Sequence, residues 1–386
     1  MSFDFDREIS RAGTASLKYD GREAYFGTDD VLPMWVADMD FAAPEAVTRA
    51  LLERAAHPIY GYTLQPDSLY DALIDWMKKR HHWPIEREWI VLTPGVVPSL
   101  NAVVMALTEP NEGVLVQPPV YFPFFSAATK TGRRQVLNPL QLDDGRYRID
   151  YDHLEQCARD ARLLLLCSPH NPVGRVWEPD ELAQVLEIAR RHRLTILSDE
   201  IHADLIYPEY RHQALATLTD DPADIVTAVA PSKTFNIPGL GLSALIVPDP
   251  ERRASIRKVL DMVHMSAANP FSITAFEAAY REGEPWLESL LVYLQQTRDA
   301  AASYIDRELP QIRLIQPEGT YLLWLDCRAL GMNDDALIHF MTHQAKLGLS
   351  PGIAFGKNGQ GFMRMNIGAP RKVVMEALER LKKALQ

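Results

Sequence analysis

The sequence is poor in cysteine and has no long hydrophobic run. Its three cysteines, Cys157, Cys167 and Cys327, are few for 386 residues and form no closely spaced pair. So few and so scattered thiols exclude a disulfide framework and a zinc site built on cysteine pairs, and we expect no metal. No stretch approaches the ~18 apolar residues of a membrane-spanning helix, and residues 1–20 contain no apolar stretch resembling a signal peptide. We therefore expect a cytoplasmic protein that does not bind membranes.

An excess of basic residues is also lacking. Lysine and arginine together number 40 against 51 aspartates and glutamates, which gives a formal net charge of −11. Nucleic-acid binding by phosphate neutralisation needs basic patches, and no lysine-arginine block supplies one. We expect no nucleic-acid partner. With 47% hydrophobic and 24% charged residues, the composition is that of an ordinary globular chain long enough for two or three domains.

Short apolar runs alternate with longer amphipathic stretches through the middle of the chain. Six runs predict buried strands that end in polar or turn residues, at 87–94, 112–119, 161–169, 193–200, 223–232 and 241–249. Helical patterns lie between them, as at 98–108 and 179–192. This alternation predicts an α/β fold with a mostly parallel sheet flanked by helices. Ligands of such sheets bind at the carboxyl ends of the strands.

The pattern changes in the last quarter of the chain. A long amphipathic helix is predicted at 285–309, followed by strands at 312–316, 320–327 and 361–368 and helices at 333–345 and 370–386. We predict a large domain over residues 46–285. A smaller α+β domain would combine residues 1–45 with residues 286–386.

One glycine motif matches a dinucleotide-binding pattern but lacks the structural context that this pattern requires. Residues 239–244, GLGLSA, fit the pattern GxGxxA of dinucleotide-binding sites. That motif must open a helix, whereas the residues that follow here predict a strand. The sequence therefore does not indicate a nicotinamide site.

Polar residues of interest fall at the ends of several predicted strands. They are the turn 95–97 in TPGVVPSL, Asn171 in CSPHNPVG, Asp199 in SDEIHADL and Lys233 in APSKTFNIPG. Singly, each has an ordinary structural explanation, as a turn, a helix-capping carboxylate or a solvated lysine. Arg364 stands alone in an apolar strand, and a buried arginine usually binds an anion such as a carboxylate. Together these residues indicate one ligand site.

With these residues in this order, the sequence resembles the fold-type I pyridoxal-phosphate enzymes of the aminotransferase class I/II superfamily. The likeness rests on NPVG, SDEIH, SKTF and the late arginine, and it covers essentially the whole chain. FDREISRAGTASLKYD, MWVADMDFAAPEAV, YGYT, PPVYFPF and SDEIHADL further resemble a narrower group, the MalY/PatB-type C–S lyases of the cystathionine β-lyase branch.

The resemblance implies pyridoxal 5'-phosphate (PLP) as the cofactor and three catalytic residues. Lys233 would form the Schiff base with it, Asp199 would pair with its ring nitrogen, and Tyr121 would stack on its ring. The other implied cofactor contacts are Asn171, at the ring's phenolate oxygen, His202, where aminotransferases usually carry tyrosine, and Ser232 with the backbone of Gly95, Val96 and Val97, at the phosphate. Aminotransferases commonly add an arginine near Gly241, which this chain lacks, so its phosphate site is one charge poorer.

The same resemblance implies substrate and subunit contacts. Arg364 would bind the substrate carboxylate, helped by Asn171 and by the backbone near Ala37. Tyr62 would reach the phosphate from a second subunit, which makes the protein a homodimer with shared sites; Tyr60 is the alternative for that role.

The implied function is a PLP-dependent C–S β-lyase that cleaves cystathionine or other cysteine S-conjugates to a thiol, pyruvate and ammonia. An aminotransferase would use the same residues, and a PLP-containing regulatory or binding protein is a third possibility. The motifs do not separate lyase from aminotransferase, so the lyase prediction follows from the resemblance alone.

Overall fold

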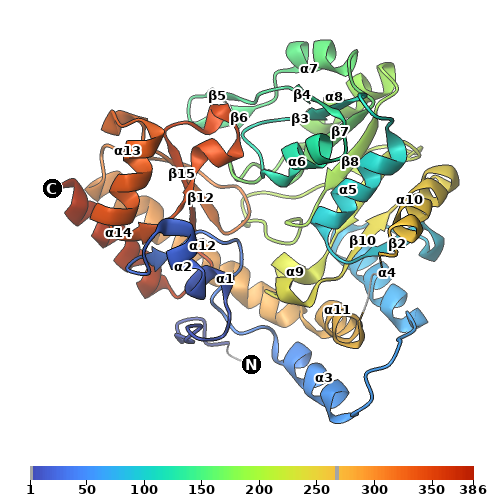
Figure 1. Ribbon diagram of the computed structural model, residues 1–386, viewed down its shortest axis with the longest axis horizontal. Helices are drawn as coiled ribbons and strands as arrows, with labels where there is room; N and C mark the ends of the chain where they lie inside the picture. Colours follow the sequence, from blue (N-terminus) through green and yellow to red (C-terminus); the bar gives the residue numbers. More distant parts are fainter. Residues whose placement is uncertain (1–2, 266–268) are drawn as a thin grey trace.

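The main sheet of the computed structural model, which describes residues 3–265 and 269–386, has seven strands (Figure 1). In spatial order they are β2 (Ile90–Thr93), β10 (Ser243–Ile246), β9 (Ile225–Val229), β8 (Thr195–Asp199), β7 (Leu163–Cys167), β3 (Gly113–Val116) and β4 (Arg134–Leu137). β10 runs antiparallel to both neighbours, and the other pairs are parallel. The predicted α/β fold and its six strands are confirmed. β4 was not predicted, because its charged, half-exposed residues lack an apolar run.

Helices cover both faces of this sheet, which explains why its strands are continuously apolar. Alternate side chains of β7 point to opposite faces: Leu164 and Leu166 belong to one buried cluster, Leu163 and Leu165 to another. The first cluster includes α4 (Asp67–His81), α7 (Tyr151–Ala158), α8 (Pro179–Arg191) and α11 (Pro270–Glu282), onto which α3 (Glu45–Ala56) packs. The second includes α5 (Val96–Leu107), α6 (Pro123–Lys130) and α10 (Pro250–Met262).

A second, antiparallel sheet is built from the C-terminal part of the chain. Its order is β11 (Arg313–Ile315), β12 (Leu322–Asp326), β15 (Phe362–Asn366) and β14 (Ser350–Pro351). α13 (Asp334–His339) and α14 (Arg371–Leu385) accompany it, so the three strands and two helices predicted here are confirmed. The short β14 and the hairpin of β5 (Gln141–Asp143) and β6 (Arg146–Arg148) were not predicted.

One helix is shared by the two sheets. α12 (Glu284–Glu308) is a continuous helix of 25 residues, as predicted from its apolar periodicity. It contacts α11 of the large sheet's layer, and it also contacts α14 and β11 of the second sheet. In Figure 1 it passes behind the middle of the molecule.

The N-terminal segment lies beside the C-terminal part. After α1 (Leu17–Asp20) and α2 (Arg22–Phe26), β1 (Leu32–Pro33) pairs in parallel with β13 (Leu347–Gly348). The Asp40 N–H donates to the Gly368 carbonyl at 2.7 Å. The segment also touches the other side, because the Asn236 side chain bonds the backbone of Met39 and Phe41. The domain boundaries at 45/46 and 285/286 stay a prediction.

In residues 3–265 and 269–386, no helix has both the length and the apolar character needed to span a membrane.

A buried ion pair fixes this N-terminal segment. The Lys18 side chain is fully buried, and its Nζ lies 2.8 Å from Asp40 Oδ2. Asp40 also accepts a hydrogen bond from Arg11 at 2.8 Å and one from the Tyr19 hydroxyl at 3.2 Å. The carboxylate is therefore the shared acceptor of three donors around α1.

We expect Asp40→Ala to lower the free energy of unfolding by about 3–5 kcal/mol, because it leaves the Lys18 ammonium buried without a partner. The matched control is Glu282→Ala, which removes an exposed pair with Arg49 and should cost at most about 1 kcal/mol. Urea denaturation followed by circular dichroism gives both values. Equal losses in the two variants would contradict the prediction.

Candidate active site

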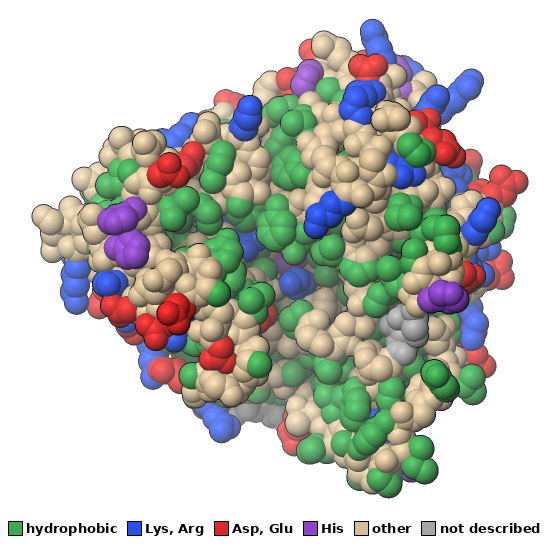
Figure 2. All heavy atoms as spheres, in the orientation of Figure 1, with side chains coloured by type: hydrophobic (Ala, Val, Ile, Leu, Met, Phe, Trp, Pro, Cys, Tyr) green, Lys and Arg blue, Asp and Glu red, His purple; other side chains and the backbone are tan. Residues whose placement is uncertain are grey.

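A cavity of about 400 Å³ opens where the carboxyl ends of the parallel strands face the second sheet. Its lining includes Cys167 at the end of β7, Asp199 at the end of β8, Ala230 just after β9 and Pro94 just after β2. Arg364 of β15 contributes from the opposite side. Figure 2 shows a hollow in the middle of this face, with a basic side chain visible inside it. The sheet topology thus gathers residues that are distant in sequence at one place.

The cavity contains almost every residue predicted for the site. Eleven of the twelve line it: Ala37, Gly95, Val96, Val97, Tyr121, Asn171, Asp199, His202, Ser232, Lys233 and Arg364. The exception is Tyr62. In particular, Lys233 and Asp199 share one cavity, which is the arrangement that the prediction required. Their chemical roles stay predictions.

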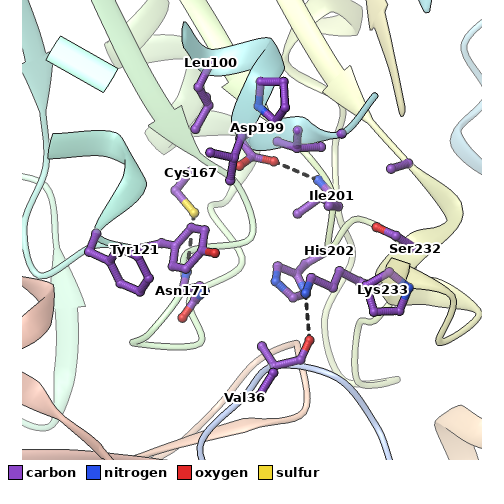
Figure 3. A pocket seen from close by; sticks show the side chains of 18 of the residues that line it. Val36, Leu100, Tyr121, Cys167, Asn171, Asp199, Ile201, His202, Ser232 and Lys233 are labelled. Carbon is purple, nitrogen blue, oxygen red and sulfur yellow. Dashed lines mark hydrogen bonds between the residues drawn. The ribbon is translucent and has the colours of Figure 1, made fainter. Parts of the chain in front are cut away.

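Lys233 lies on the single-turn helix α9 (Pro231–Thr234), directly after the edge of β9. Its Nζ donates a hydrogen bond to the Ala37 carbonyl at 2.7 Å, shown as a dashed line in Figure 3. Burial lowers the pKa of this amine to about 8; the Arg364 charge also lowers it, while Asp38 and Asp199 oppose the shift. An amine with a pKa near 8 is partly unprotonated at neutral pH, as a nucleophile or base must be.

Asp199 is a buried carboxylate whose hydrogen bond comes from the backbone N–H of Ile201 at 3.2 Å (Figure 3). Burial raises its pKa to about 7, helped by the Glu200 charge and opposed by the Ile201 N–H and by Lys233. Because burial disfavours the charged form of this carboxylate, a cationic partner beside it would stabilise that form strongly. The protonated ring nitrogen of PLP is such a group, so the residue fits the cofactor.

Tyr121 and Asn171 are fixed relative to one another by their backbones. The Tyr121 N–H donates to the Asn171 carbonyl at 3.0 Å, and the Asn171 N–H contacts Cys167 Sγ at 3.4 Å (Figure 3). The neighbouring His170, which the sequence left without a role, bonds the Pro119 carbonyl at 2.9 Å and is fully buried. It therefore supports the loop that presents Asn171.

Arg364 is a buried guanidinium with neutral partners. It donates to Asn171 Oδ1 at 3.1 Å, to the Trp35 carbonyl at 2.8 Å and to Ser350 Oγ at 3.2 Å. Its Nε has no hydrogen-bond partner among the described residues. Burial lowers its pKa only to about 10, so it stays charged at neutral pH. A planar cation in this state suits a substrate carboxylate.

The opposite end of the cavity offers backbone amides and hydroxyls. Gly95 precedes α5 at φ 158° and ψ 162°, a region of the backbone map used almost only by glycine. The N–H groups of Val96 and Val97 lie in the first turn of this 12-residue helix, where they lack intrahelical acceptors. Ser232 and Gly241 line the same cavity. Such an end fits a phosphate, although the lining includes no lysine or arginine besides Lys233 and Arg364.

His202 and a residue missed by the sequence analysis complete the site. Burial lowers the pKa of His202 to about 3, with Lys233 and Arg364 adding to the shift, so the imidazole is neutral. Its ring lies 6.1 Å from that of Tyr321. The Tyr321 hydroxyl donates at 2.8 Å to the Ala37 carbonyl, the same oxygen that Lys233 uses. No motif marked Tyr321, because one tyrosine opening an apolar strand is an ordinary core residue.

Trp35, Tyr25 and Phe355 also line the cavity without having been predicted. Trp35 and Ala37 both belong to the segment WVADMDF, which is one of the segments that carry the resemblance. Nothing in the sequence distinguished Tyr25 or Phe355.

Tyr62 does not reach the cavity of its own chain. Its side chain is fully exposed, in the segment 57–66 between α3 and α4. The alternative, Tyr60, is engaged within its chain, because its hydroxyl donates to the Ala55 carbonyl at 2.9 Å and its ring lies 5.6 Å from Phe271. Of the two, Tyr62 is the side chain free to contact a second subunit.

Residues 29–381 match the family model described as aminotransferase class I and II. The chain is 45% identical over 385 residues to cystathionine beta-lyase PatB of Bacillus subtilis (strain 168), covering 99% of this chain and 100% of the relative. It is 32% identical to protein MalY of Escherichia coli (strain K12), over 100% of this chain and 99% of MalY.

A solved structure gives the same picture. The PLP-bound C–S lyase from Staphylococcus hominis superposes with a TM-score of 0.93 at 33% sequence identity, covering 100% of this chain and 98% of that one.

We expect Lys233 of the cofactor-free protein to react with acetic anhydride at half its maximal rate near pH 8, because burial lowers the pKa of its amine. The unprotonated, reactive fraction rises as pH rises through that value. Competitive labelling with a trace of the reagent, read by peptide mass spectrometry, gives the profile. In the urea-unfolded chain the same lysine should titrate near its ordinary value of about 10.4. A folded-state midpoint above pH 10 would refute the prediction.

Proposed function

The chain belongs to the aminotransferase class I and II family, and from this we propose that it is a PLP-dependent C–S β-lyase. It would cleave cystathionine or other cysteine S-conjugates to a thiol, pyruvate and ammonia. The observation that carries the PLP dependence is the meeting of the buried amine of Lys233 with the buried carboxylate of Asp199 in one cavity. The lyase names of the relatives at 45% and 33% identity support the reaction type.

The residues of the chain would hold the cofactor at three places. Asp199 would keep a proton on the ring nitrogen, Tyr121 would pack on the ring, and the amides of residues 95–97 with Ser232 would hold the phosphate. Once bound, PLP supplies an electron sink for a carbanion at the substrate Cα. His202, neutral and buried, adds no competing charge beside the ring.

Two basic residues would act on the substrate itself. Arg364 would bind the α-carboxylate through its fork and so orient Cα toward Lys233. The proton leaves Cα for Lys233 Nζ, whose lowered pKa suits a base at neutral pH. The Cβ–S bond then breaks with its electron pair on sulfur, and the thiolate takes a proton. One water molecule converts the remaining three-carbon fragment to pyruvate and ammonium. The sum involves no net oxidation and needs no reactant besides the amino acid and water.

We also propose that the protein works as a cytoplasmic homodimer with shared sites. The exposed Tyr62 supports a homodimer with shared sites, because its side chain is suited to complete the phosphate end of another subunit's cavity. Cys157, Cys167 and Cys327 are all free and buried, which suits a reducing compartment.

The reaction type is tested by incubating the PLP-loaded protein with cystathionine and, in parallel, with S-methyl-L-cysteine. We expect pyruvate and thiol in equal amounts without any added 2-oxo acid, because elimination is redox-neutral. Lys233→Ala should lower the rate at least about a hundredfold, whereas the exposed Lys130→Ala should not change it. Product formation that strictly requires a 2-oxo acid would instead identify an aminotransferase.

The shared site is tested by complementation. Chains with Tyr62→Ala and chains with Lys233→Ala are each impaired, but a mixed dimer restores one intact site. Unfolding and refolding a 1:1 mixture should therefore recover about a quarter of the wild-type activity, since half of the dimers are mixed and each has one site. If the mixture is no more active than its components, Tyr62 does not act across subunits.

A further inference from the structure

Each charged side chain that lines the cavity already has a role in the function proposed above. Among its lining residues, the charged side chains are Lys233, Asp199 and Arg364. Lys233 would act on Cα, Asp199 would pair with the cofactor ring, and Arg364 would bind the substrate carboxylate. None remains for a charge on the part of the substrate beyond the sulfur.

The outer wall of the same cavity is apolar. Leu17 of α1, Tyr25 of α2 and Phe122 just before α6 line it, with exposed fractions of 64%, 51% and 52%. Isolated exposed apolar side chains are common, but a set that rims one cavity indicates a surface for a ligand. Figure 2 shows hydrophobic side chains on both sides of the hollow.

The apolar wall continues inward to the arginine that would hold the substrate. The Tyr25 ring lies 4.1 Å from that of Trp35, whose carbonyl accepts from Arg364 at 2.8 Å. On the other side, the Arg364 guanidinium carbon lies 4.8 Å from the centre of the Phe355 ring. A substrate anchored by its α-carboxylate would thus extend along aromatic and aliphatic side chains.

Asp38, a carboxylate whose charge acts on Lys233, is already paired. Arg11 holds both oxygens of Asp38, at 3.0 and 2.7 Å, and Asp38 does not line the cavity. The segment 57–66, which a second subunit would add, contains no aspartate, glutamate, lysine or arginine. The proposed dimer therefore brings this segment to the cavity without a charged partner for the substrate.

We propose that the wall formed by Leu17, Tyr25, Phe122, Trp35 and Phe355 receives the sulfur substituent of the substrate and selects uncharged alkyl or aryl groups. The inference rests on the proposed lyase function and specifies its substrate class. Cystathionine fits this wall poorly, because its distal end carries an ammonium and a carboxylate that would lose water without gaining partners.

The test compares two thioethers that differ only in that distal end. S-propyl-L-cysteine has the carbon skeleton of cystathionine without the distal ammonium and carboxylate. We expect its kcat/KM for pyruvate formation by the PLP-loaded enzyme to exceed that of cystathionine at least about tenfold. It should also exceed that of S-methyl-L-cysteine by about tenfold, since each buried methylene adds up to about fourfold. Leaving-group ability alone would favour cystathionine, because the distal ammonium stabilises the thiolate that cystathionine releases.

A substitution at the rim shows whether this wall is responsible. Leu17→Arg should raise kcat/KM for cystathionine and lower it for S-propyl-L-cysteine. The ratio of kcat/KM for S-propyl-L-cysteine to that for cystathionine should fall at least about fivefold. The rate with S-methyl-L-cysteine, which is too short to reach the rim, should stay unchanged. Val292→Arg places the same charge on α12 at a residue with 55% exposure that does not line the cavity, and it should alter none of the three rates.

Binding of analogues that cannot react gives a readout independent of turnover. L-2-aminoheptanoic acid and 2,7-diaminosuberic acid replace the sulfur of the two thioethers by a methylene. Isothermal titration calorimetry should show the first binding at least about tenfold more tightly.

The outcomes separate the two proposals. If both thioethers yield pyruvate but cystathionine is the better substrate, or if Leu17→Arg leaves the ratio unchanged, the inference is overturned and the lyase function stands. If neither yields pyruvate without a 2-oxo acid, the lyase function itself fails; the calorimetry then still decides whether the wall prefers uncharged groups.

Discussion

The hydrogen bond between Lys233 Nζ and the Ala37 carbonyl joins the two halves of the site. It connects the turn after β9 with the N-terminal segment, and Tyr321 of the C-terminal part donates to the same oxygen. A buried amine needs such an acceptor, because removal from water otherwise disfavours its charged form. The lysine can therefore sit in a cavity only if residues near 37 are held in place.

Two side chains near Lys233 provide that support. Asn236, at φ 55°, bonds the backbone of Met39 on both its N–H and its carbonyl and the carbonyl of Phe41. Thr234 donates to the buried carboxylate of Asp204 at 2.9 Å, and Asp204 also accepts from the Trp76 indole of α4 at 3.2 Å, which ties α9 to that helix. The lysine is thus braced on both flanks, and asparagine is suited to the left-handed backbone at 236 because its short polar side chain tolerates it.

The strands and the polar residues at their ends could be predicted because both depend on local pattern. Runs such as LLLLC at 163–167 are apolar on both faces only in a covered sheet, and such a sheet collects Asn171, Asp199 and Lys233 at one edge. Tyr321 and Ser350 were not predicted, because each donates to a backbone carbonyl more than 280 residues away in sequence, at Ala37 and Trp35, and no local pattern encodes such a contact. Tyr25 was not predicted either, because an exposed tyrosine in a short helix has no pattern of its own. Tyr62 was singled out by the resemblance alone, and its exposed position in one chain is what a contact to another subunit requires.

The uninterrupted helix α12 has a mechanical consequence. It packs against both layers of the molecule, so rotation of one sheet relative to the other would have to bend 25 helical residues rather than turn a flexible linker. Large rigid-body closure is therefore resisted. The elements that line the outer part of the cavity are α1 and α2, with four and five residues, and the buried Lys18–Asp40 pair anchors α1. Incoming molecules would thus meet an opening whose backbone is held in place, and only the exposed side chains of Leu17 and Tyr25 would adjust its width.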